Sequence, residues 1–361
     1  MDAADESEVL MPDNGAYRVY LGAYTAEGGA AGIGLAEASP AGSLHVTGHV
    51  AEVADPSFLA LAPDGGTLYA VSERSEGRVV ALSVRPDGTL REVNSQPAEG
   101  ASPCHLSVHP SGRYLLTANY GSGNVVVHPI GEGGALRSAT HVLQHRGTGP
   151  NPHRQEGPHL HQVLTDPAGR VLVVDLGSDA VHVHDFDTDT GHLVNDRTVG
   201  LRAGSGPRHL AFHPDGERGY LLNELASSIT EFDYDSSTGV LRPLHALSTL
   251  PPDYARANLA AEVVVDLRGR YVFASNRGHD SIAVFDADSA DGELRLVDIR
   301  PAGVTEPRHI ALSPDGSVLL VAGQRSNDVQ AFAVDDLTPL GEPVAVPSPV
   351  CLLPVQSSLA S

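Results

Sequence analysis

The sequence predicts an all-β fold: a seven-bladed β-propeller whose blades are four-stranded antiparallel sheets. Three observations predict it: a repeat of about 50 residues, two turn signals within each repeat, and incomplete units at the two ends that complement one another. The chain also has 38 Gly and 26 Pro among its 361 residues. Such a composition supplies many tight turns and argues against a mostly helical protein.

The repeat is clearest in four segments that begin with Pro, alternate apolar residues, turn at Pro-Asp-Gly or a variant, and enter a second apolar strand. They are PSFLALAPDGGTLYAVSE (56–73), PCHLSVHPSGRYLLTANYGSG (103–123), PRHLAFHPDGERGYLLNELAS (207–227) and PRHIALSPDGSVLLVAGQRSN (307–327). Weaker copies occupy residues 160–179 and 261–280. A second hairpin turn follows the first, as in SVRPDGTL and FDYDSSTGVL, so each unit is expected to form a four-stranded meander.

The two ends of the chain supply the seventh blade. Residues 17–50 contain the last three strands of a unit, and SPVCLLPV (348–355) resembles a lone first strand. Joined, they close the ring and leave no free sheet edge. We therefore expect a disordered acidic tail over residues 1–15 and a single propeller domain over residues 16–361.

Composition and charge narrow the partners and the compartment. The formal net charge is −22, and all 23 basic residues are Arg. A surface this acidic disfavours nucleic acid and anionic membranes as partners, and an anion site must use Arg or His. The acidic N-terminus lacks a secretory pattern, no apolar stretch approaches the ~20 residues of a membrane span, and the two cysteines provide no disulfide framework. These features predict a cytoplasmic protein; the oligomeric state is left open.

The repeat aligns polar residues in two columns that should meet at one mouth of the central channel. The first column follows the opening position of each unit: Ser57, Cys104, His161, Arg208, Ala261 and Arg308. The second ends the second strand: Ser72-Glu73, Asn119-Tyr120, Asp175-Leu176, Asn223-Glu224, Asn276-Arg277 and Gly323-Gln324. The scarce cations thus converge, which predicts an anion site. Ala261 and Glu262 are expected to interrupt the first column.

An insertion lies beside these columns. The turn glycines Gly65, Gly112, Gly169, Gly216, Gly269 and Gly316 are spaced by 47, 57, 47, 53 and 47 residues. The excess in the second interval lies in QHRGTGPNPHRQEGPHLH (144–161), a Gly- and Pro-rich stretch that leads into a first strand. A long loop above a channel mouth is typical of a lid or binding loop.

Several motifs resemble one known family. GSGPRHLAFHPDG, YLLNEL, ASNRGHDSIAVF, PSPVC and GPNPHRQEGPHLHQV together resemble the seven-bladed lactonase family. That family includes the propeller-type cytoplasmic 6-phosphogluconolactonases and the fungal carboxymuconate cyclases. The resemblance covers the chain after the acidic tail. In the cyclase branch it implies a catalytic set of one His, two Arg and one Glu, which falls here on His159 or His161, Arg208, Glu224 and Arg277.

The resemblance implies hydrolysis of an anionic sugar lactone, with 6-phosphogluconolactone as the expected substrate, in the pentose phosphate pathway of carbohydrate metabolism. His161, His159 or Glu224 is expected to serve as the base that takes a proton from water. Arg208 and Arg277 are expected to hold the phosphate and the developing oxyanion. The predicted further substrate contacts are Arg308, His309, Asn276, Asn223 and Gln324. No metal and no cofactor are expected.

Three alternatives remain open at this point. A cycloisomerase acting on a carboxylated muconate would use the same residue types. A non-catalytic propeller that binds a small anion or a protein is another class, although the chain has no Trp and so lacks the Trp-Asp ends of WD repeats. A metal site at His159 and His161 is the third, but only His153 in the loop is at hand as a further ligand.

The remaining histidines and the cysteines have a simpler interpretation. His105 and His209 are expected on the strand face opposite to the channel column. His109 and His213 precede turn prolines. We expect all four to serve packing and turn hydrogen bonds, and Cys104 and Cys351 to be small buried hydrophobes.

Overall fold

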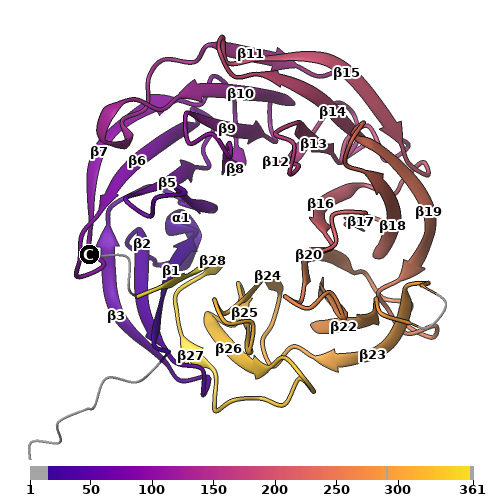
Figure 1. Ribbon diagram of the computed structural model, residues 1–361. Helices are drawn as coiled ribbons and strands as arrows, with labels where there is room; N and C mark the ends of the chain where they lie inside the picture. Colours follow the sequence, from indigo (N-terminus) through magenta and orange to yellow (C-terminus); the bar gives the residue numbers. More distant parts are fainter. Residues whose placement is uncertain (1–14, 290–291, 358–361) are drawn as a thin grey trace, which may run out of the picture.

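Seven four-stranded antiparallel sheets surround a central axis in the computed structural model (Figure 1). The structure describes residues 15–289 and 292–357. The expected acidic tail falls almost wholly on residues outside these ranges, so the tail and the domain boundary after it stay predictions. Within the described ranges, no helix is long and apolar enough to cross a membrane.

Each blade runs from an inner strand at the axis to an outer strand at the rim. The first three blades, from inner to outer strand, are β28 (Pro349–Gln356), β1 (Tyr17–Ala23), β2 (Ile33–Ala38), β3 (Leu44–Ala51); β4 (Leu59–Leu61), β5 (Thr67–Ser72), β6 (Arg78–Val84), β7 (Leu90–Pro97); and β8 (Pro103–Val108), β9 (Tyr114–Asn119), β10 (Asn124–Pro129), β11 (His141–Gln144). The next two are β12 (Leu160–Thr165), β13 (Val171–Asp175), β14 (Ala180–Asp187), β15 (His192–Gly200); and β16 (Pro207–Phe212), β17 (Arg218–Asn223), β18 (Ser228–Asp235), β19 (Val240–Ser248). The last two are β20 (Leu259–Val265), β21 (Tyr271–Arg277), β22 (Ser281–Asp286), β23 (Arg295–Pro301); and β24 (Pro307–Leu312), β25 (Val318–Gly323), β26 (Asp328–Ala333), β27 (Val344–Ala345).

The ring is closed by both ends of the chain, as predicted. The C-terminal strand β28 forms the inner strand of the first blade and pairs antiparallel with β1, from Tyr17 opposite Gln356 to Ala23 opposite Pro349. Val350, Cys351 and Leu352 of β28 are buried. The seven blades and this closure are therefore confirmed.

Apolar faces of neighbouring blades pack against each other and form the core. One interface, for example, joins Leu116 and Val125 of the third blade to Val163 and Val173 of the fourth. Successive residues of the second and third strands point to opposite faces of the blade. Because neighbouring blades cover both faces, these strands are apolar at nearly every position.

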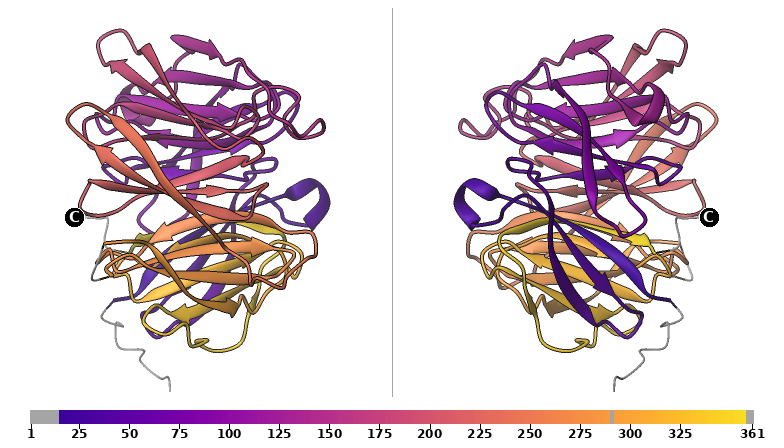
Figure 2. Two further views of the ribbon diagram at one scale, coloured as in Figure 1. Left: turned by 90° about the vertical axis from the view of Figure 1, so that its right-hand side faces the viewer. Right: turned by 90° about the vertical axis from the view of Figure 1, so that its left-hand side faces the viewer.

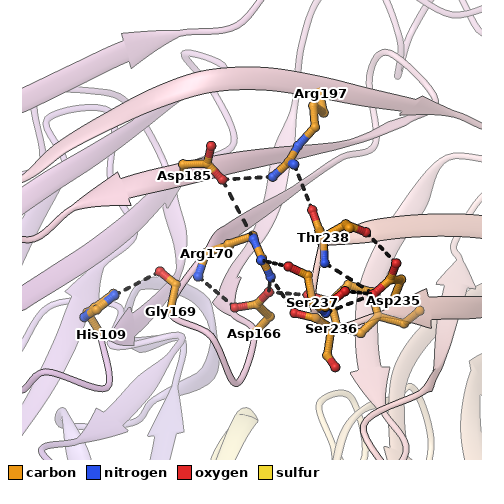
Figure 3. Close-up of polar contacts among 11 residues, drawn as sticks. His109, Asp166, Gly169, Arg170, Asp185, Arg197, Asp235, Ser236, Ser237 and Thr238 are labelled. Atoms are coloured by element: carbon orange, nitrogen blue, oxygen red, sulfur yellow. Dashed lines mark hydrogen bonds and ion pairs between the residues drawn. The ribbon is translucent and has the colours of Figure 1, made fainter.

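Residues in the turns form hydrogen bonds between neighbouring blades. Figure 3 shows Arg170, which follows the turn after β12. Its guanidinium donates to Asp166 at 2.8 Å and to the carbonyls of Ser236 and Ser237 in the next blade at 2.9 and 2.7 Å. The two histidines before turn prolines behave as predicted: His109 Nε2 lies 3.1 Å from the Gly169 carbonyl oxygen, and His213 Nε2 lies 2.8 Å from that of Gly269.

A short α-helix, α1 (Thr25–Gly28), lies between β1 and β2, and a 3-10 turn, η1 (Glu132–Gly134), lies between β10 and β11. The helix α1 stands out from one face of the ring (Figure 2). The backbone amides of Thr25 and Ala26 donate to Asp55 Oδ1 at 2.8 and 3.0 Å. Arg74 Nε lies 2.7 Å from the other oxygen of Asp55, so this loop is tied to the neighbouring blade.

Candidate functional site

A β-bulge near the start of the inner strands determines which side chains face the axis. The strand register skips one residue in β8, β12, β16 and β24, and two residues in β20. The skipped residues are Cys104, His161, Arg208 and Arg308, together with Ala261 and Glu262. All of these except Glu262 belong to the first predicted column, and Ser57, its remaining member, precedes β4. A bulge leaves the extra residue unpaired and re-aims its side chain, so consecutive residues can face the same side.

The first consequence is a cluster around Glu224, which directly follows β17. Three guanidiniums, each from a different segment of the chain, contact its carboxylate. Arg154 Nη2 lies 2.6 Å from Oε1, Arg277 Nη2 lies 3.0 Å from Oε2, and Arg208 Nε lies 3.2 Å from Oε2. The side chains of Glu224, Arg208 and Arg277 are almost fully buried, whereas that of Arg154 is one-third exposed. One carboxylate therefore faces three positive charges.

The electrostatics of the cluster follow from this imbalance. Burial alone would raise the pKa of Glu224, but the charges of Arg277, Arg208 and Arg154 outweigh it and lower the pKa to about 2. Burial lowers the pKa of Arg277 to about 10, against the attraction of Glu224. Burial, together with the charge of Arg308, also lowers the pKa of Arg208. Glu224 thus stays ionised, and the cluster keeps a net positive charge.

Several buried nitrogen atoms around this cluster have no hydrogen-bond partner among the described residues, including Nε of Arg277 and Nδ1 of His161. Both side chains are more than nine-tenths buried. A buried polar atom that loses water without gaining a partner costs about 1–3 kcal/mol. A bound anion or its water would satisfy these atoms.

The two histidines of the HLH motif have different surroundings. His159 stacks on the Tyr120 ring, with centroids 4.5 Å apart. Its Nδ1 lies 2.9 Å from the Tyr120 carbonyl oxygen and its Nε2 lies 3.1 Å from Glu156 Oε1. Both ring nitrogens of His159 thus lie against oxygen atoms of the protein. His161 lies deeper, and burial together with the charges of Arg208, His209 and Arg308 holds its pKa well below 6.5.

The expectation that His105 and His209 lie on the strand face opposite to the channel column is wrong. Both rings lie among the channel residues: their centroids are 5.3 Å apart, and the His209 ring is 5.2 Å from His161. Arg208 Nη1 lies 3.8 Å and His209 Nδ1 lies 2.7 Å from the carboxylate of Glu262. Two consecutive residues thus face one carboxylate, because the bulge cancels the alternation that the expectation assumed.

The expectation that Glu262 interrupts the polar column is wrong for the same reason. The bulge in β20 turns Glu262 toward the axis, where it joins His209 and, at 3.5 Å, His309 Nε2. Burial raises the pKa of Glu262 and lowers that of His309 to about 4. His309 therefore lies with His105, His161 and His209, and these four residues form an inner histidine layer.

Arg308 belongs to a third group at the same axis. Its Nη2 donates to the Tyr24 hydroxyl at 3.0 Å, and that hydroxyl donates to Glu73 Oε2 at 3.0 Å. The Arg308 charge also acts on the pKa of Arg277 and of His161. The structure thus brings Arg308 into the neighbourhood of the Glu224 cluster.

The three predicted amides differ from the charged residues. Asn223 donates to Ser228 Oγ at 3.1 Å and to Thr230 Oγ1 at 2.9 Å within its own blade. Asn276 donates to the Thr249 carbonyl at 2.9 Å and accepts from the Thr249 hydroxyl at 2.7 Å. Both are buried and hold strands and turns together. Gln324 is partly exposed at the end of β25, and its backbone amide donates to the Glu306 carbonyl at 3.1 Å.

The sequence analysis did not identify Arg154 and did not predict that its loop contributes a residue to the site. Gln155 fixes the loop: its amide donates to the Leu176 carbonyl at 2.9 Å and to Asp179 Oδ1 at 2.8 Å. Arg154 Nε then donates to the Tyr120 hydroxyl at 3.1 Å while its Nη2 reaches Glu224. The signal in the sequence was an Arg within the predicted lid, next to a Gln in a Gly/Pro-rich stretch.

The metal alternative finds no ligand group in the described part of the chain. Across residues 15–289 and 292–357, no three or more His, Cys, Asp or Glu side chains are arranged to hold a metal ion. His153 is exposed, and its backbone amide donates to Asn151 Oδ1 at 3.0 Å in the loop. Freedom from metal and cofactor stays a prediction. Cys104 and Cys351 are both buried and not in a disulfide, as predicted.

Comparisons with known proteins agree with this architecture. The chain is 33% identical over 344 residues to the 6-phosphogluconolactonase of Bacillus subtilis, covering 93% of this chain and 97% of that protein. The solved structure of the periplasmic gluconolactonase of Pseudomonas aeruginosa has a TM-score of 0.87, with 31% identity and coverage of 95% of this chain and 99% of that one. A solved protein from Lactobacillus plantarum has a TM-score of 0.88 at 32% identity, covering 94% and 100%. Residues 18–354 match the family described as lactonase, 7-bladed beta-propeller. The chain therefore belongs to the seven-bladed β-propeller lactonase family.

Proposed function

We propose that this protein hydrolyses a sugar lactone that carries an anionic group, with 6-phosphogluconolactone as substrate. One observation carries the proposal: Arg154, Arg208 and Arg277 surround Glu224 with an excess of positive charge, while Arg277 Nε and His161 Nδ1 are buried without a partner among the described residues. The names of the Bacillus and Pseudomonas relatives support the reaction class.

The arginines suit the two charges of this reaction. A guanidinium presents planar, paired donors to phosphate or to a developing oxyanion, and it stays charged when it is buried. Arg277 and Arg208 would stabilise the oxygen that becomes negative when water adds to the lactone carbonyl. Arg154, on the loop and partly exposed, would contact the phosphate from the solvent side.

His161 is the base that fits the surroundings best. Its low pKa keeps the imidazole neutral at physiological pH, so it is ready to accept a proton from water. Glu224 is unsuited to that role, because three guanidiniums occupy its oxygens and hold its pKa at about 2. We propose that Glu224 instead keeps the arginines in place.

Depressed basicity limits how strongly His161 can pull a proton, but the reaction demands little. A lactone is already an activated ester, so a positioned water and charge stabilisation supply most of the required acceleration. A general base contributes typically ~10²–10⁴-fold to such a reaction.

The test compares three substrates with the purified protein. The proposal predicts hydrolysis of freshly generated 6-phosphogluconolactone above the spontaneous rate, and a higher KM for unphosphorylated gluconolactone because it lacks the anion. Equal kcat/KM for the two lactones would contradict the phosphate contact. Turnover of a carboxylated muconate with no lactone hydrolysis would assign the site to cycloisomerisation instead.

A further inference from the structure

A second carboxylate lies near the Glu224 cluster, in a very different setting. Glu73 directly follows β5, and its Oε2 accepts a hydrogen bond from the Tyr24 hydroxyl at 3.0 Å. The same hydroxyl accepts one from Arg308 Nη2 at 3.0 Å, and the Arg308 guanidinium lies over the Tyr24 ring at 5.5 Å from its centroid. The chain of donors therefore runs in one direction, from Arg308 through Tyr24 to Glu73.

These three residues come from distant parts of the sequence. Tyr24 precedes α1 in the loop that Asp55 ties down, Glu73 follows the second strand of the next blade, and Arg308 is the bulge residue of β24. All three are partly exposed, whereas Glu224 is buried. A phenol that is held from both sides can position one carboxyl oxygen and leave the other oxygen for a proton.

Glu224 and Glu73 therefore differ in how readily they bind a proton. Glu224 faces three guanidiniums and stays an anion. Glu73 is held through a neutral hydroxyl, and burial raises its pKa, opposed by Arg308, the hydroxyls of Ser57 and Tyr24, and Arg208. Neighbouring carboxyls whose environments push their pKa values apart are a recurrent arrangement for separate acid and ionic roles.

We propose that Glu73 is the general acid of the lactone hydrolysis, donating its proton to the ring oxygen that leaves, and that Tyr24 is its positioning residue. This inference rests on the proposed function. It assigns a catalytic role to Glu73 that the reaction needs, because the leaving oxygen of a sugar lactone is a basic alkoxide.

The step balances as follows. His161 takes one proton from water, and the hydroxide oxygen bonds to the carbonyl carbon. The bond between that carbon and the ring oxygen then breaks, and the ring oxygen takes the proton from Glu73 Oε1. The product is the open hydroxy acid, which ionises to the carboxylate. Transfer of the proton from His161 to Glu73, directly or by release to and uptake from solvent, restores both groups.

The same two charged side chains influence His161 and Glu73. Arg208 and Arg308 act on the pKa of both groups, lowering each. Both arginines are bulge residues of inner strands, so the base and the acid are influenced by the same pair of guanidiniums. Such a pair of titrating groups predicts a bell-shaped dependence of kcat on pH, rising as His161 loses its proton and falling as Glu73 loses its own.

The experiment measures kcat and KM of the full-length protein on the phosphorylated lactone across pH 5–8. We expect Glu73→Gln to lower kcat by ~10²–10⁴-fold with little change in KM, and to remove the falling limb at high pH. Tyr24→Phe keeps the acid but removes a hydrogen bond that lowers its pKa, so the falling limb should move to higher pH. A purely structural role would not move that limb.

The matched control is Glu231→Gln. Glu231 is a buried carboxyl on β18 whose pKa burial also raises, but its partners are His245 and the Leu294 amide, away from the cluster. This variant should keep the wild-type pH profile. Glu73→Gln with wild-type kcat, or with an unchanged falling limb, would overturn the acid role while leaving the lactonase proposal intact. A wild-type rate equal to spontaneous hydrolysis would overturn both.

Discussion

Arg154 and Glu224 form a 2.6 Å ion pair that joins a loop to a strand end in another blade. Arg154 belongs to the long loop between β11 and β12, and Glu224 follows β17, 70 positions later in the chain. The pair ties the loop to the same carboxylate that Arg208 and Arg277 contact. An insertion that sequence length alone identified as a lid thus supplies one of the three guanidiniums on Glu224.

Removing this guanidinium should weaken substrate binding. We expect Arg154→Ala to raise KM for the phosphorylated lactone by roughly tenfold, the loss of one exposed charge-assisted contact of about 1.5 kcal/mol. The value of kcat should change less, because Arg208 and Arg277 stay in place. Steady-state kinetics measure both. Arg146→Ala is the control, since Arg146 lies in the same loop but lines a separate cleft of about 540 Å³ beside β14; an equal effect in both variants would exclude a specific role for Arg154.

Neutralising Glu224 should destabilise the fold as well as the activity. Glu224→Gln leaves Arg208 and Arg277 buried without their counter-charge, which costs about 3–5 kcal/mol in comparable sites. Urea unfolding at pH 7 measures this cost. The pair of Asp298 and Arg300 is 2.7 Å apart but about half exposed, so Asp298→Asn should change the free energy of unfolding by less than about 1 kcal/mol. Comparable losses in the two variants would contradict the buried-cluster interpretation.

The comparison of wild type with Glu224→Gln also predicts how the free energy of unfolding depends on pH. The pKa of Glu224 falls from 4.5 to about 2 on folding, so its ionised form stabilises the folded protein above pH 4.5. This contribution is lost as the pH drops through about 2. The difference in unfolding free energy between wild type and Glu224→Gln should therefore shrink between pH 4.5 and pH 2. A difference independent of pH in that window would show that the charge is not responsible.

A buried histidine between the third and fourth blades, His145, should limit stability in mild acid. Burial, together with His182 and His184, lowers the pKa of His145 to about 3, whereas the unfolded chain takes up this proton near 6.5. Folding stability is thus fully present above pH 6.5 and falls as the pH drops toward 3. At pH 5 the loss attributable to His145 is about 2 kcal/mol. His145→Gln should lose less Tm than wild type between pH 7 and pH 5, and exposed His49→Gln on β3 should match wild type.

The closing strand should be essential to the ring. Removing residues 349–361 deletes β28 and exposes the apolar faces that pack on Val350, Cys351 and Leu352. We expect loss of cooperative thermal unfolding and aggregation, because an inner strand is missing and the ring is open. Removing only residues 358–361 leaves β28 whole and serves as the control. A cooperative transition at the wild-type Tm in the long truncation would contradict the closure.

The regular part of the architecture could be predicted because turn chemistry and period-two apolar runs repeat in every unit. Gly65, Gly112, Gly169, Gly216, Gly269 and Gly316 all adopt positive φ at the turns that the repeat identified. The second column correctly brought Glu224 and Arg277 together, because both follow the same point in their strands.

The inner histidine layer could not be predicted from alternation. His105, His209 and Glu262 face the axis because bulges break the period of two, and no residue pattern in a single sequence announces a bulge. The position of Arg154 depends on loop hydrogen bonds made by Gln155, which tertiary structure alone determines. The cytoplasmic location stays a prediction, and the Pseudomonas relative is a periplasmic protein.

The most direct test of the central claim is the initial rate of 6-phosphogluconolactone hydrolysis by wild type and Arg208→Ala, with EDTA present and the spontaneous rate subtracted. Circular dichroism confirms that both are folded. We predict a wild-type rate well above spontaneous hydrolysis, unchanged by EDTA, and a loss of at least ~10²-fold in kcat/KM for the variant. A wild-type rate equal to the spontaneous rate, or a fully active Arg208→Ala, would contradict the assignment of the arginine cluster as a lactonase site.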